Sequence, residues 1–67
     1  MVNAVVTLLY PGWIQTKVEE VADVVKDEER NGFVYLKDSN GKTKKFYNQN
    51  VVMSIEYVEE DSGAEER

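Results

Sequence analysis

FVYLKDSNGKTKKFYNQNVVMSIEYV (residues 33–58) carries the strongest strand signal in this chain of 67 residues. Residues 33–37 and 51–58 are rich in β-branched and aromatic residues, which favour strands. The residues SNG at 39–41 lie between them, and Asn-Gly is typical of the turn of a hairpin. This stretch therefore predicts an antiparallel sheet.

The length of the hairpin loop determines which aromatic ring faces the core. A two-residue loop would pair Val34 with Tyr47, whereas a three-residue loop with Gly41 in the left-handed conformation would pair Val34 with Phe46. We expect the three-residue loop, because it places Phe46 on the same face as Val34 and Leu36. The residues then expected to face outward are Phe33, Tyr35, Lys37, Lys45 and Tyr47.

Residues 2–10, VNAVVTLLY, predict a strand whose two faces are both largely apolar. Its second face would be covered either by another copy of the chain or by the rest of a well-closed small barrel. A Pro11-Gly12 turn follows, since this pair suits the central positions of a type II turn. The candidate residues for self-association are Val5, Thr7, Leu9 and Trp13.

Residues 14–30 allow two structures. As a helix they would place four apolar residues, at 14, 18, 21 and 25, on one face, with Gly32 as the C-terminal cap. As a bent strand they would use their many β-branched residues, which are poor helix formers. We expect the strand. The helical alternative would give an α+β domain in which the helix packs on an antiparallel sheet.

The predicted order is five strands, the second long and bent, in a mainly β domain. This order resembles the small SH3-like barrel, and residues 33–58 are similar in shape to the end of an Sm-like domain. The resemblance implies ring assembly and RNA binding. It is a resemblance of shape, because the glycine and nucleobase-contacting residues of Sm-like loops are not identifiable here. We expect one small domain over residues 1–58 and a flexible acidic tail over 59–67.

Charge is distributed unevenly along the chain, whose net charge is -5. Residues 30–50 hold five basic residues and one acidic residue, a local net charge of +4, while both flanking segments are acidic. The overall acidity argues against non-specific binding of nucleic acid, and the basic segment allows one local binding face. The candidate partner-binding residues are Tyr35, Lys37, Lys42, Lys44, Lys45 and Tyr47.

The composition excludes several kinds of chemistry. The chain has no Cys and no His, so it lacks the commonest general base, the strongest nucleophile and the usual zinc ligands. We therefore expect no catalytic site, no metal and no cofactor, and the chain is not expected to be an enzyme. Its apolar runs are too short to cross a bilayer, which predicts a cytoplasmic protein, in the host cell if a phage encodes it.

Two functions fit these features. The first hypothesis is a non-catalytic, self-associating binding module that blocks or sequesters a macromolecular partner, in the manner of small inhibitors or regulators from phages and mobile elements. Its partner would be a protein, further copies of the chain, or both. The second hypothesis is an Sm-like module that binds RNA or a nucleotide through the basic hairpin of residues 37–47.

Overall fold

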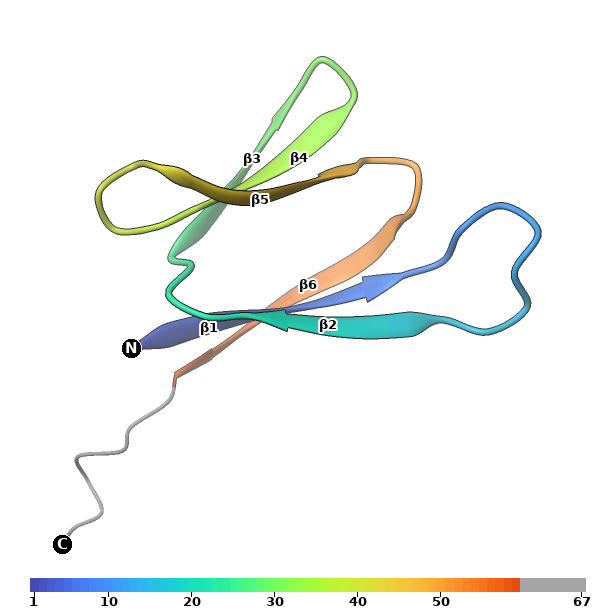
Figure 1. Ribbon diagram of the computed structural model, residues 1–67, viewed down its shortest axis with the longest axis horizontal. Coiled ribbons are helices and arrows are strands. Elements are labelled where there is room, and N and C mark those ends of the chain that lie inside the picture. Colours follow the sequence, from blue (N-terminus) through green and yellow to red (C-terminus); the bar gives the residue numbers. More distant parts are fainter. Residues whose placement is uncertain (60–67) are drawn as a thin grey trace, which may run out of the picture.

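The computed structural model describes residues 1–59, and within them the chain folds as two three-stranded antiparallel sheets (Figure 1). The strand orders are β2-β1-β6 and β3-β4-β5. The strands are β1 (Val2–Leu8), β2 (Lys17–Val21), β3 (Lys26–Arg30), β4 (Phe33–Lys37), β5 (Thr43–Asn48) and β6 (Val52–Glu59). The predicted mainly β class is confirmed. The described strands number six rather than five, and their pairing does not close the two sheets into a barrel.

The strand β1 is the centre of the first sheet. It pairs with β2 on one side and with β6 on the other, and both pairings are antiparallel. Alternate residues Ala4, Val6 and Leu8 are fully buried against the second sheet. The side chains between them, Val5 and Thr7, are half-buried on the outer side of the sheet.

Residues 14–30 contain no helix, so the helical alternative is wrong. The expected bent strand is divided into β2 and β3 by a kink at Asp23, whose φ is 59°. The backbone N–H of Asp23 donates to the side chain of Asn3 at 3.3 Å, which holds the kink in place. After it, Val24 N–H donates to Val2 of the first sheet and Val25 N–H donates to Lys37 of the second, both at 2.9 Å. The chain therefore crosses between the sheets here.

Two glycine turns build the second sheet. Asn31 and Gly32 both have positive φ, 54° and 83°, and join β3 to β4 as the two-residue loop that Asn-Gly favours. The next loop has the expected three residues, because Asp38 N–H donates to the Lys42 carbonyl at 2.9 Å and Gly41 has a φ of 81°.

The predicted register of β4 with β5 is nevertheless wrong. A bulge leaves Lys44 without a register partner, so the pairing moves by one residue and Val34 lies opposite Tyr47. Tyr47 is therefore in the core with 6% of its surface exposed, and Phe46 is outside with 58% exposed. The bulge reverses the roles that the loop length alone predicts for the two rings.

The core lies between the two sheets. Most of its residues come from the inner faces of β1 and β4, and Val24 from the crossing segment is fully buried among them. The buried apolar residues are Ala4, Val6, Leu8, Val24, Val34, Leu36, Tyr47 and Val51. Since both sheets contribute, each needs the other to bury its apolar face.

The expected acidic tail, residues 59–67, lies outside the described residues apart from Glu59, which ends β6. Within residues 1–59 no helix has the length and apolar character needed to span a membrane.

Candidate functional site

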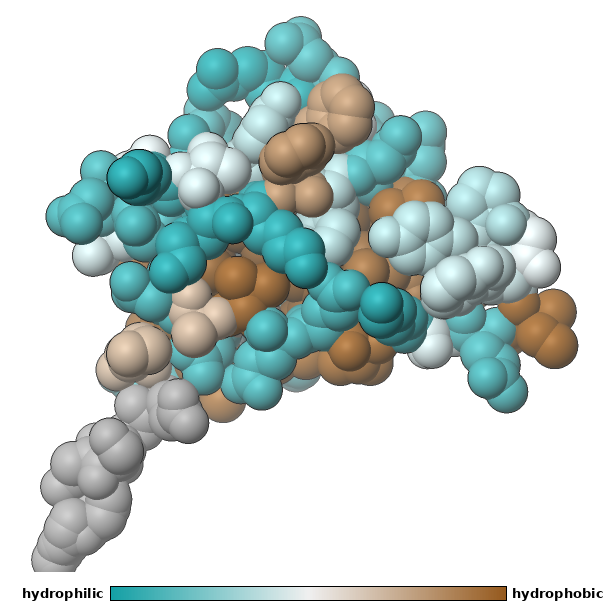
Figure 2. All heavy atoms as spheres, viewed as in Figure 1, coloured by the Kyte–Doolittle hydropathy of each residue, from teal (hydrophilic) through white to brown (hydrophobic). Residues whose placement is uncertain are grey.

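A cluster of three aromatic rings lies on the outer side of β3-β4-β5. Phe46 of β5 contacts both Phe33 and Tyr35 of β4, with centroids 5.9 and 5.8 Å apart, and the latter two rings are 6.4 Å apart. Phe46 and Phe33 are exposed and Tyr35 is half-buried. Figure 2 shows a small group of hydrophobic side chains over β4 and β5 with hydrophilic ones around it. The rings are accessible to a partner.

Basic side chains surround the rings on the same side of the sheet. The register places Lys26, Glu28 and Arg30 of β3 opposite residues of β4 that face outward. Lys44 is the exposed bulge residue of β5, two residues before Phe46, and we count it with this side. We call this surface the aromatic face; its residues are Lys26, Glu28, Arg30, Phe33, Tyr35, Lys37, Lys44 and Phe46. It holds four cations and one carboxylate, a net charge of +3.

The one carboxylate of the aromatic face holds two of the cations. Arg30 Nη2 lies 3.0 Å and Lys37 Nζ 3.2 Å from the two oxygens of Glu28. The hydrogen bond from Arg30, followed by that from Lys37, lowers the pKa of Glu28 below its ordinary value. Glu28 is thus ionised at neutral pH and fixes both cations beside Tyr35, which lies opposite it in the register.

The predicted partner-binding residues fall in three places. Tyr35, Lys37 and Lys44 lie on the aromatic face, and Lys42 lies in the loop that precedes β5. Lys45 and Tyr47, which were expected to face outward, are on the inner side, because the bulge at Lys44 moves the register by one residue. The expectation that these two residues face outward is wrong.

Sequence reasoning missed five residues of the aromatic face: Lys26, Glu28, Arg30, Phe33 and Phe46. Phe33 was expected to face outward but was not proposed as a binding residue, and Phe46 was assigned to the core. The Asn-Gly pair at 31–32 could have predicted that Lys26 and Arg30 lie on this face, because a two-residue loop fixes the pairing of β3 with β4.

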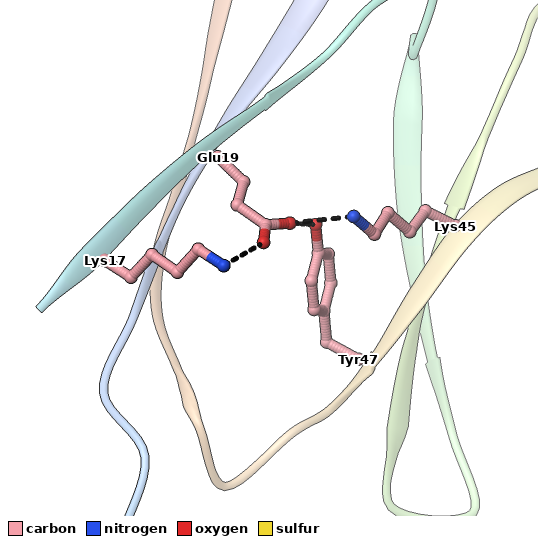
Figure 3. A network of polar contacts seen from close by, with 4 residues as sticks. All are labelled: Lys17, Glu19, Lys45 and Tyr47. Carbon is pink, nitrogen blue, oxygen red and sulfur yellow. Dashed lines mark hydrogen bonds and ion pairs between the residues drawn. The ribbon is translucent and has the colours of Figure 1, made fainter. Parts of the chain in front are cut away.

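Lys45 and Tyr47 instead join the two sheets through Glu19 of β2 (Figure 3). Glu19 Oε1 accepts hydrogen bonds from Lys45 Nζ at 2.8 Å and from the Tyr47 hydroxyl at 2.6 Å. Its other oxygen lies 3.2 Å from Lys17 Nζ. One carboxylate therefore ties β2 of the first sheet to β5 of the second. These two predicted binding residues stabilise the packing of the sheets.

This network makes stability depend on pH. Hydrogen bonds from Lys45, Tyr47 and Lys17 lower the pKa of Glu19 from 4.5 to about 2. A carboxyl with a lowered folded pKa contributes stability that is complete above its unfolded pKa and is lost as pH falls through the folded one. We expect Glu19→Gln to lower the free energy of unfolding by about 1 kcal/mol at pH 7, and the difference from wild type to vanish toward pH 2.

Urea unfolding followed by circular dichroism over this pH range measures the difference. The matched control is Glu56→Gln, which removes the same charge from an exposed position of β6. A difference between wild type and Glu19→Gln that stayed constant from pH 7 to pH 2 would contradict the network.

A second polar contact also spans the sheets. The Tyr57 hydroxyl of β6 donates to Asp27 of β3, and burial followed by this hydrogen bond raises the pKa of Tyr57. Asp27 and Glu29 line a hollow beside this contact, together with Val34, Gln49, Val52 and Ile55. Within residues 1–59, no three carboxylates come together in the way that a metal ion requires.

The predicted self-association residues lie around the outer side of β2-β1-β6. Val5, Thr7 and Leu9 are half-buried there, and the neighbouring Val18 of β2 has 61% of its surface exposed. Trp13 lies apart from them in the loop after β1, where its ring contacts Tyr10 at a centroid distance of 4.8 Å. It is 48% exposed, so this Trp does not fill the core.

Comparison with protein-family models, with curated proteins and with solved structures finds no significant match to this chain.

Proposed function

We propose that this chain is a non-catalytic binding module that holds a polyanionic macromolecule on the aromatic face. The observation that carries the proposal is the contact among Phe33, Tyr35 and Phe46 on the outside of a sheet. Clusters of exposed aromatic rings are rare on proteins that bind no partner, because an exposed ring gives up the stabilisation that burial provides. Such clusters are common anchors of binding surfaces.

The charge around the rings indicates the kind of partner. The aromatic face has a net charge of +3 within a chain of net charge -5, so the remaining residues together carry -8. A negatively charged partner is therefore attracted to this face and repelled by the others. The module would block or sequester such a partner, as the first of the two sequence hypotheses holds.

We also propose a relation to the SH3-type small barrel. The support is the strand order. The sheet β6-β1-β2 leads into the sheet β3-β4-β5 through the kink at Asp23, which lies between β2 and β3. If β2 and β3 are counted as one bent strand, the order is that of an SH3-like barrel left open between β5 and β6. The Sm-like form of this relation and its ring assembly rest on the same strand order.

The test is nuclear magnetic resonance of the nitrogen-15-labelled chain, titrated at low salt with an acidic peptide, heparin and a single-stranded oligonucleotide. We expect at least one polyanion to shift the amides of Phe33, Tyr35 and Phe46. The amides of Val5 and Thr7, on the other sheet, serve as the internal control and should not move. Shifts confined to the first sheet, or no shifts with any of the three, would overturn the proposal.

Self-association is the second candidate, and the half-buried Val5 on the outer side of β1, together with the exposed Val18 of β2, favours it. Thr7 lies opposite Val18 of β2, which is exposed, and Val5 lies opposite Glu20 of β2 and Glu56 of β6. Two copies meeting on this side would leave the aromatic face free. Sedimentation of the samples used for resonance measurements reports the state of association, and a monomer at high micromolar concentration would exclude this candidate.

A further inference from the structure

We propose that the polyanion bound by the aromatic face is single-stranded nucleic acid. This inference rests on the proposed function, and it names the class of partner that the same surface takes. Two properties of the face carry it: the accessibility of its rings and the positions of its cations.

The rings offer stacking surfaces. Phe46 contacts both Phe33 and Tyr35, and its ring plane makes angles of 78° and 34° with theirs. A base that stacks on such a ring gains affinity, and stacking needs no particular base because every base has a π face. An acidic peptide would form ion pairs with the cations, but it would gain little affinity from contact with a group of neighbouring rings.

The cations lie where they can reach a phosphate backbone that passes the rings. Arg30 is opposite Phe33 in the register, and Lys44 comes two residues before Phe46. Both are exposed, and Arg30 is already held by Glu28 at 3.0 Å. Basic groups beside aromatic rings are the arrangement with which proteins bind single strands: the cations follow the backbone while the rings take the bases.

A single strand fits this face better than a duplex. In a duplex the faces of the bases are stacked on one another and are closed to protein rings. A duplex would therefore meet the aromatic face only through its phosphates, and the rest of the acidic chain would oppose that contact. In a single strand the bases can turn outward and stack on Phe33, Tyr35 and Phe46.

Fluorescence anisotropy with labelled oligouridine and oligothymidine tests the inference at about 50 mM and about 200 mM salt. We expect both strands to bind at low salt and a duplex to bind much more weakly. Phe46→Ala should weaken single-strand binding roughly 5- to 100-fold, since it removes one stacking ring. Lys44→Ala should weaken it and reduce the dependence of log affinity on log salt by about 0.7, the value for one phosphate contact.

Two matched controls keep the test specific. Trp13→Ala removes an exposed ring away from the aromatic face, and Lys17→Gln removes one positive charge from β2. Both should bind like wild type. Circular dichroism confirms that each variant is folded, and since Phe46 and Lys44 are both exposed, neither substitution removes a core group.

The outcomes separate this inference from the proposed function. Absence of single-strand binding, duplex binding of equal strength, or unchanged binding by Phe46→Ala would each overturn the inference. If an acidic peptide shifts the amides of the aromatic face while no oligonucleotide binds, the proposed function stands and the inference fails. If none of the polyanions binds there, both fail.

Discussion

Replacing Tyr47 by alanine should lower the free energy of unfolding by about 3–5 kcal/mol, the range for deleting a buried aromatic side chain. Tyr47 has 6% of its surface exposed and lies in the core between the sheets. Its hydroxyl also donates to Glu19 at 2.6 Å, so the substitution removes a cross-sheet hydrogen bond as well. A domain of this size has a stability margin of only a few kcal/mol, and we expect the variant to be largely unfolded at 25 °C. Circular dichroism and urea unfolding measure this.

Phe46→Ala is the matched control, because it deletes a neighbouring ring of similar size that is 58% exposed. We expect it to cost less than about 1 kcal/mol. Tyr47→Phe separates the two parts of the effect, since it keeps the ring and loses only the hydroxyl, at a cost of about 1 kcal/mol. A larger loss of stability in Phe46→Ala than in Tyr47→Ala would show that the register of β4 with β5 is the other one.

Val24→Asp should cost about 4 kcal/mol or more, because it places an unpaired carboxylate in the core. Val24 is fully buried where the chain crosses from β2 to β3. The same substitution at its neighbour Val25, which is exposed, should cost less than about 1 kcal/mol. Chemical unfolding of the two variants at pH 7 gives the comparison.

This pair of variants tests the local structure directly. A helix over residues 14–30 would bury Val25 together with Val18 and Val21, so it would reverse the order of the two costs. Equal costs at the two positions would contradict the buried crossing and would require another path for the chain between the sheets.

Local chemistry was sufficient to predict the mainly β class and the glycine turns. The Pro11-Gly12 turn is present, with Trp13 N–H donating to the Tyr10 carbonyl at 3.0 Å, and Gly12 has a φ of 87°. Gly41 likewise takes the left-handed conformation that its loop requires. These features depend on neighbouring residues alone, and sequence patterns describe such dependence well.

The register of β5 could not be predicted, because its cause lies far along the chain. The bulge at Lys44 turns Lys45 and Tyr47 toward Glu19, which is 26 and 28 residues away in sequence. Nothing in the hairpin itself signals that partner. The outward positions of Tyr35 and Lys37 were predicted, while Phe46, a ring of the candidate site, was assigned to the core.

The pairing of β1 with β6 has a consequence for the order of folding. It joins Val2 to Glu59, whereas the ladders of β3-β4-β5 connect residues that are close in sequence. Contacts between distant residues must first overcome the entropy of closing a long loop, so they form late. We expect the hairpins that carry the aromatic face to become protected from pulsed hydrogen exchange before β1 does. The surface proposed to bind a partner would then form before the sheet β2-β1-β6, which completes the core of the domain.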